Sequence, residues 1–193
     1  MGALIKALEH ASFPELAVRV CALYNDAEDA LLLGMLGQEY VIKRSGIFLY
    51  GQKAPDNHAA VVSDYLLSSG NALTMLPWRS FGDFAGRPAP EFRGEIEIPL
   101  AQYAGGIIAR AGTVLPHMDA TLDRSIIASD MSITVRALPK VYLHVDLSQD
   151  AQEFPAEVWV QFSNNADDFL SLSGMRALGE LFKERVLSLL RIY

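Results

Sequence analysis

Hydrophobic and polar residues alternate one by one along residues 140–148. One set of alternate positions is apolar and consists of Val141, Leu143, Val145 and Leu147. The other set brings an aromatic side chain next to two ionisable ones: Tyr142, His144 and Asp146. Because side chains alternate between the two faces of a β-strand, the first set is predicted to face the core and the second set to lie on the opposite face.

The same two-residue period continues on both sides of this strand. It predicts an antiparallel meander over about residues 125–162, with a short strand at residues 126–127. In this register Arg136 and Asp146 are expected to pair across strands. The face away from the core then collects mostly polar and aromatic side chains: Thr134, Arg136, Tyr142, His144, Asp146, Trp159 and Gln161.

Helical periodicity, with apolar residues three and four positions apart, appears in four segments: residues 12–24, 56–69, 99–111 and 173–190. Ser12 and Glu15 form a capping-box pattern at the start of the first segment. Residues 40–50 have the pattern of a β-hairpin. Strands that follow one another, with helices elsewhere, are typical of the α+β class. We therefore predict one domain, residues 1–193, in which helices pack on one side of an antiparallel β-meander sheet.

Residues 71–97 form a long stretch that is rich in proline and glycine and also contains several large aromatic residues. Long irregular segments in a compact chain are usually functional. We predict that Trp78 and Arg79 lie beside a partly open cleft, where the arginine fork would suit a carboxylate or a similar anion. The alternatives are that the aromatic residues only pack this loop, and that Arg79 pairs with a local acid such as Asp83.

Composition argues against several classes of partner. Apolar residues make up 51% of the chain, an excess that suggests an apolar interface such as that of a homodimer. No charge-free stretch is long enough to span a bilayer and no signal-peptide pattern opens the sequence, so we expect a cytoplasmic protein without membrane association. The net charge is −7 and the basic residues are scattered, which argues against a nucleic-acid partner.

Few residues have the spacing of a reactive site. Cys21 is the only cysteine, which excludes an internal disulfide and a cysteine-based zinc or iron–sulfur site, and it is expected to be an inert, buried thiol. His117 and Asp119 repeat the spacing of His144 and Asp146, but a transition metal needs three or four converging ligands. We predict no metal and no cofactor. The common fingerprints of nucleotide binding, serine nucleophiles and zinc hydrolases are missing, so the catalytic residues, if the protein has any, stay unknown.

The outward face of the meander and the loop of residues 71–97 supply the candidates for ligand binding. A tryptophan and a tyrosine among hydrogen-bonding groups are typical of a recognition surface. The alternatives are a solvated sheet face and a face covered by the loop around Trp78. The candidate ligand-binding residues are Trp78, Arg79, Arg136, Tyr142, His144, Asp146 and Trp159.

Three segments occur in an order that resembles a known family. They are DYLLSSG (residues 64–70), LPWRSFGDFAG (76–86) and FPAEVWVQFSNNADDFL (154–170). The chain resembles, from about Glu39 to its carboxyl end, the bacterial and archaeal family called domain of unknown function 3786. The resemblance implies an anaerobic metabolic setting and no established activity. Some members carry an iron–sulfur segment, which is not carried over to a chain with one cysteine.

Two classes of function follow from these observations. The first is a noncatalytic binding or accessory domain that recognises a protein or a small ligand. The second is an enzyme whose site lies between the sheet and the Trp78 loop, with His144 or His117 as acid or base. A deep pocket that joins His144, Arg79 and Trp78 would favour the enzyme, and a flat aromatic patch on a symmetric dimer would favour the binding domain.

Overall fold

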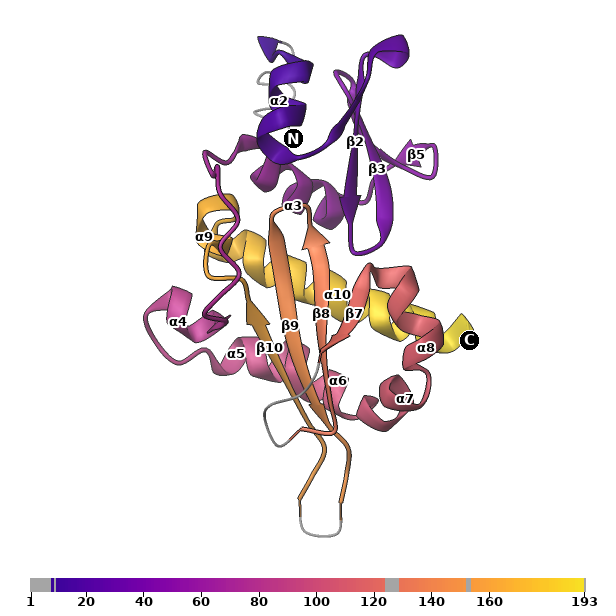
Figure 1. Ribbon diagram of the computed structural model, residues 1–193, viewed down its shortest axis with the longest axis vertical. Coiled ribbons are helices and arrows are strands. Elements are labelled where there is room, and N and C mark those ends of the chain that lie inside the picture. Colours follow the sequence, from indigo (N-terminus) through magenta and orange to yellow (C-terminus); the bar gives the residue numbers. More distant parts are fainter. Residues whose placement is uncertain (1–7, 9, 124–128, 152–153, 193) are drawn as a thin grey trace.

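The computed structural model describes residues 8, 10–123, 129–151 and 154–192. Two five-stranded antiparallel sheets follow one another along the longest axis of the molecule, and most of the helices lie around the second sheet (Figure 1). This architecture confirms the α+β prediction, and the predicted hairpin of residues 40–50 belongs to a complete sheet of its own. Among the described residues, none of the helices combines the length and the apolar character needed to cross a membrane.

The first sheet is an up-and-down meander of five strands: β1 (Leu23–Asn25), β2 (Ala30–Met35), β3 (Gln38–Lys43), β4 (Gly46–Leu49) and β5 (Gln52–Lys53). A short 3-10 turn, η1 (Asp26–Glu28), joins the first two strands. One face of the sheet packs against α2 (Phe13–Val20) and α3 (Asp56–Leu67). We call the first sheet with α2 and α3 the first lobe, and the second sheet with the helices around it the second lobe. The side chains of Leu33, Tyr40 and Ile42 are fully buried on this face, so the core of the first lobe lies here.

The first helix is shorter than the sequence predicted. It ends at Val20, and Cys21 adopts a left-handed conformation with φ 53°, which turns the chain into β1. Cys21 was predicted to be buried but is exposed, and Leu23 lies 70% exposed on a strand instead of in the helix. The predicted capping box is also wrong, because Ser12 makes no side-chain cap hydrogen bond with the described residues.

The second sheet has the strand order β6 (Arg79–Ser80), β10 (Glu157–Phe162), β9 (Val141–Ser148), β8 (Met131–Leu138) and β7 (Ala120–Asp123). All neighbouring strands are antiparallel, as the two-residue period predicted. Leu143 and Val160 are buried while Trp159 is 45% exposed, so the predicted register is confirmed. The short strand predicted at residues 126–127 lies outside the described residues.

Helices cover the core face of the second sheet. Two lie nearest the carboxyl end: α9 (Ala166–Phe169) and the long α10 (Leu172–Ile192). The others follow one another between β6 and β7: α4 (Phe81–Ala85), α5 (Pro90–Phe92), the π-helical turn η2 (Arg93–Glu97), α6 (Ile98–Ala101), α7 (Ala104–Ala109), α8 (Ala111–Val114) and the 3-10 turn η3 (Leu115–Met118). α10 passes behind the second sheet and reaches α3, so it joins the two lobes (Figure 1).

The turn between β2 and β3 makes a second junction between the lobes. Leu36 and Gly37 have φ values of 52° and 72°, and the Leu36 N–H donates to the carbonyl oxygen of Ala137 in the second lobe at 3.0 Å. A Cβ atom at Gly37 would lie 2.2 Å from the carbonyl oxygen of His117. Only glycine lets the two backbones approach this closely at a positive φ.

A buried carboxyl group links η2 to the second sheet and leads to a prediction. Glu97 is buried, accepts a hydrogen bond from the Val160 N–H at 3.0 Å, and burial raises its pKa. The folded state binds the Glu97 proton more tightly than the unfolded state, so protonation of Glu97 stabilises the fold. This stabilisation is lost as the pH rises through the pKa of Glu97 in the folded state.

We therefore expect Glu97→Gln to be more stable than the wild type at about pH 8, because the amide keeps the acceptor for Val160 without the buried charge. The difference should shrink as the pH is lowered to about the ordinary carboxyl pKa of 4.5. Urea denaturation across this range measures it. A variant that is less stable than the wild type at about pH 8 would contradict a buried, proton-holding Glu97.

Candidate functional site

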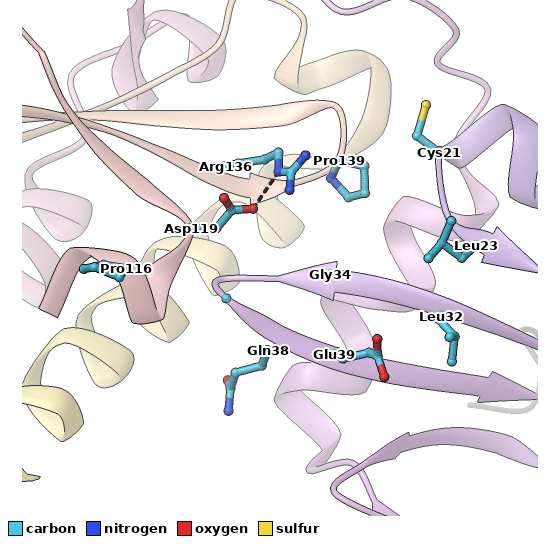
Figure 2. A pocket seen from close by; sticks show the side chains of 11 residues that line it. Cys21, Leu23, Leu32, Gly34, Gln38, Glu39, Pro116, Asp119, Arg136 and Pro139 are labelled. Atoms are coloured by element: carbon cyan, nitrogen blue, oxygen red, sulfur yellow. Dashed lines mark hydrogen bonds and ion pairs between the residues drawn. The ribbon is translucent and has the colours of Figure 1, made fainter. Parts of the chain in front are cut away.

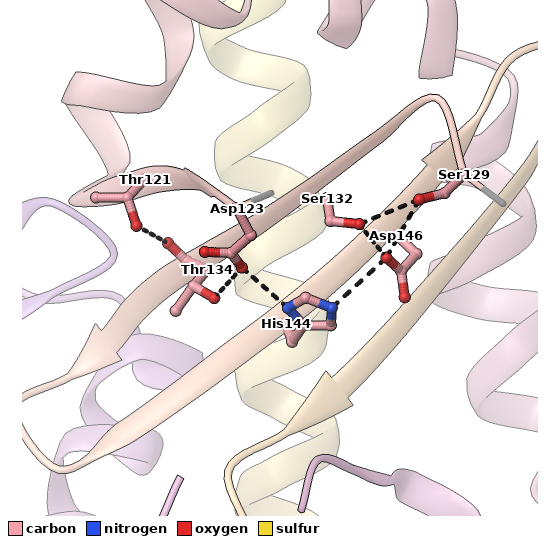
Figure 3. A network of polar contacts seen from close by, with 7 residues as sticks. All are labelled: Thr121, Asp123, Ser129, Ser132, Thr134, His144 and Asp146. Atoms are coloured by element: carbon pink, nitrogen blue, oxygen red, sulfur yellow. Dashed lines mark hydrogen bonds and ion pairs between the residues drawn. The ribbon is translucent and has the colours of Figure 1, made fainter. Parts of the chain in front are cut away.

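His144 is the centre of a polar network on the second face of the second sheet (Figure 3). Its Nδ1 lies 3.2 Å from the carboxylate of Asp123 on β7. Its Nε2 lies 3.5 Å from the carboxylate of Asp146, which is on β9 together with His144. Thr134 donates a hydrogen bond to Asp123 and Ser132 donates one to Asp146. The strand register places these groups together, since His144 is opposite Thr134 and Asp146 is opposite Ser132.

The centre of the network is shielded from solvent, whereas Asp123 at its edge is partly exposed. The Trp78 ring stacks on the His144 imidazole, with ring centroids 5.0 Å apart and an angle of 11° between the planes. His144 and Asp146 are both only 9% exposed. The Nδ1 atom of His144 is within ion-pairing distance of Asp123 but has no well-directed hydrogen bond among the described residues. The arrangement suits a buried imidazole held between two carboxylates, with the tryptophan as its cover.

Arg79 is engaged by the protein itself. Its guanidinium lies over the Phe84 ring at 3.9 Å and approaches the backbone carbonyl oxygens of Asn164 and Asp83 at 3.5 and 3.4 Å. The Asp83 carboxylate, the predicted alternative partner, instead caps α4 by accepting a hydrogen bond from the Ser80 N–H at 2.8 Å. This side-chain and backbone hydrogen bonding to Ser80 lowers the pKa of Asp83. These contacts indicate a packed loop around Trp78 and Arg79.

The remaining candidates do not converge on this network. The predicted pair between Arg136 and Asp146 is wrong, because Arg136 Nε lies 2.6 Å from the Asp119 carboxylate. Asp119 lies in the turn before β7, close to Arg136 on β8, whereas Asp146 is held by Ser132. The Trp159 ring lies under the Arg93 guanidinium at 4.4 Å. Tyr142 is half-buried opposite Arg136.

A large concave surface lies elsewhere, between the two sheets (Figure 2). It is an open cleft of about 800 Å³, and of the candidate residues only Arg136 lines it. The first lobe contributes Cys21, Leu23, Leu32, Gly34, Gly37, Gln38 and Glu39. The second lobe contributes Pro116, Asp119, Arg136 and Pro139.

Local conformation explains why the cleft has this lining. The left-handed Cys21 turns the chain outward, and Leu23 is paired with Leu32 on the sheet face that points away from the core. Gly34 is on the same face, and no described atom lies within 4 Å of the position its Cβ would take. These residues were not among the predicted candidates, because the apolar pattern of the first helix continues through Leu23. Gly34 in the middle of β2 was the one feature of the sequence that could have indicated this surface, because a glycine leaves the strand without a side chain there.

The lining of the cleft carries more negative than positive charge. Its lining includes the carboxylates of Glu39 and Asp119 and the single guanidinium of Arg136. Arg136 is neutralised by Asp119, and the pKa of Arg136 is raised by the hydrogen bond to this partner. Glu39 forms no ion pair with the residues that the structure describes. The cleft therefore combines an apolar floor with one uncompensated negative charge.

The histidine and aspartate spacing does not assemble a metal site in the described ranges. His117 is exposed on η3, whereas His144 is buried on β9. In this part of the chain no group of three histidine, cysteine, aspartate or glutamate side chains is arranged to hold a metal ion.

Comparison with known proteins identifies a family. A family model described as Domain of unknown function (DUF3786) matches residues 12–185. The match includes the first sheet and begins well before Glu39, where the sequence motifs first supported the resemblance. No curated protein and no solved structure matches the chain.

Proposed function

Because the chain belongs to the DUF3786 family, whose description carries no activity, we propose from its geometry that it is a noncatalytic domain that binds a small amphipathic cation. The observation that carries the proposal is the cleft of about 800 Å³ between the two sheets. Ligand sites in proteins commonly have volumes of about 300–1,000 Å³ and lie between structural units. The cleft meets both conditions.

The lining supports the class of ligand. Leu23 and Leu32 offer apolar surface to the body of a ligand. Glu39 offers a carboxylate that no described cation neutralises, so it favours a positively charged group at this end of the cleft. The Arg136–Asp119 pair closes the opposite wall and supplies hydrogen-bonding groups without a net charge.

Acid–base catalysis by His144 has less support. A general base must reach a proton on a substrate, and the stacked Trp78 ring covers the imidazole. Neither His144 nor Trp78 lines the cleft of about 800 Å³.

Thioflavin T, an elongated aromatic cation, is a suitable probe of the cleft. We expect it to bind saturably with increased fluorescence and to slow the alkylation of Cys21 by N-ethylmaleimide, since this exposed thiol lines the cleft. As the only cysteine of the chain, Cys21 reports on this site alone, and mass spectrometry measures its modification.

Two variants test the location of the probe. Gly34→Phe places a ring in the open space of the cleft and should abolish both the fluorescence increase and the protection of Cys21. Glu39→Gln should weaken binding about tenfold by removing the counter-charge. Gly106→Phe is the matched control, since Gly106 is an exposed glycine on α7 with open space around it among the described atoms. Unchanged thioflavin binding by Gly34→Phe would refute the proposal.

A further inference from the structure

A second, smaller cavity lies where the first sheet meets α3 and α10. It measures about 180 Å³ and is bounded by the core face of β2 and β3, whereas the large cleft lies on the opposite face of the same strands. Met35, Leu36 and Leu181 form its apolar part. Its polar lining consists of Gln38, Tyr40, His58, Glu184, Arg185 and Ser188.

The imidazole of His58 is held in one orientation by Tyr40. The phenol oxygen of Tyr40 lies 2.6 Å from His58 Nδ1. Burial raises the pKa of Tyr40, so the phenol keeps its proton and is able to donate it to Nδ1. Burial lowers the pKa of His58, so the ring is neutral at physiological pH. The tautomer that accepts the phenol proton at Nδ1 carries its own proton on Nε2, and in this tautomer His58 is a positioned hydrogen-bond donor.

Helix α10 brings two unpaired opposite charges to the same cavity. Glu184 and Arg185 both line it, and neither forms an ion pair in the described part of the chain. Arg185 donates from Nη2 to the His117 carbonyl oxygen at 3.0 Å. Its Nε is buried without an acceptor among the described residues. A buried donor without an acceptor is uncommon, and a bound group would account for it.

We propose that this cavity binds a small zwitterion, an α-amino acid with a short side chain. Arg185 and the Nε2–H of His58 receive the carboxylate, and Glu184 receives the ammonium group. Water occupies about 30 Å³, so the cavity has room for about six non-hydrogen atoms, the number in alanine. The apolar part of the lining suits its methyl group. Glu184 lines the cavity with its side chain exposed, so its carboxylate attracts an ammonium group, which a zwitterion carries and a simple anion lacks.

Titration with L-alanine, followed by amide NMR, tests this site. We expect saturable shifts in α3, β3 and α10, with much weaker effects from acetate, methylammonium or L-tryptophan. Glu184→Gln and Arg185→Gln should each weaken L-alanine binding about tenfold or more. The matched controls are Glu180→Gln and Arg191→Gln, which change the same residue types on α10 outside the cavity lining and should leave binding unchanged.

The outcomes separate this site from the cleft. Gly34→Phe, which blocks the cleft, should leave L-alanine binding unchanged, and Glu184→Gln should leave thioflavin binding unchanged. If L-alanine produces no saturable shift, the proposal is wrong. It is also wrong if acetate binds as tightly as L-alanine and Glu184→Gln has no effect, since the cavity would then be only an anion site.

Discussion

Gly37→Ala is expected to lower the free energy of unfolding by about 3 kcal/mol or more. The new Cβ would lie 2.2 Å from the carbonyl oxygen of His117 and 2.8 Å from the Cα of Met118, which are backbone atoms that cannot rotate away. The left-handed φ of 72° adds the strain that an alanine suffers there. To relieve this clash, the β2–β3 turn must move away from η3, and this movement breaks the junction between the lobes.

Gly34→Ala is the matched control for this prediction. Gly34 is on the same strand pair but has an ordinary φ and open space at its Cβ position among the described atoms. The added methyl should change the free energy of unfolding by less than about 1 kcal/mol. Urea denaturation of both variants measures the difference. Equal stability of the two variants would show that the turn does not contact η3 as closely as described.

His144→Ala should destabilise the protein by about 2–4 kcal/mol. The substitution removes the imidazole that lies between Asp123 and Asp146, so both carboxylates lose a polar partner. It also leaves a space beneath the Trp78 ring, which now stacks on the imidazole. Both effects occur at a site that is nearly closed to solvent, so water and salt screen the electrostatic interactions there only weakly.

His117→Ala is the control for the second prediction, because His117 has the same sequence spacing to an aspartate but an exposed side chain. It should change stability by less than about 0.5 kcal/mol. Thermal and urea denaturation compare the two variants, and tryptophan fluorescence reports whether Trp78 loosens in His144→Ala. Folded His144→Ala should still bind thioflavin T in the cleft. A His144→Ala variant as stable as the wild type would contradict a structural role for the network.

The hairpin strands β3 and β4, the meander strands β8, β9 and β10, and the last helix could be predicted from the sequence alone. Each of these elements buries one face, and burial imposes a local period that the chain must carry. Alternation along β9 therefore indicated that Leu143 faces the core and His144 the other side, and the structure confirms it. The 3.6-residue period likewise located α10 to within a few residues.

The ends of elements and the partners of side chains were decided only by the tertiary structure. The apolar pattern of the first helix continues into Leu23, but the left-handed Cys21 ends the helix and a strand pairing takes over. The alternation of the strands suggested that Arg136 pairs with Asp146 on the neighbouring strand. The chain reversal that follows η3 instead brings Asp119 next to Arg136. Local periodicity carries no information about such reversals.

Both candidate binding sites also depend on long-range contacts. The cleft exists because the β2–β3 turn meets the second lobe, and the smaller cavity because α10 returns to the first sheet after more than a hundred residues. The sequence by itself determined which residues are apolar, charged and periodic. How the two lobes meet decided which charged residues of the described ranges form ion pairs with one another, because charge pairing depends on distances in space and not on spacing along the chain.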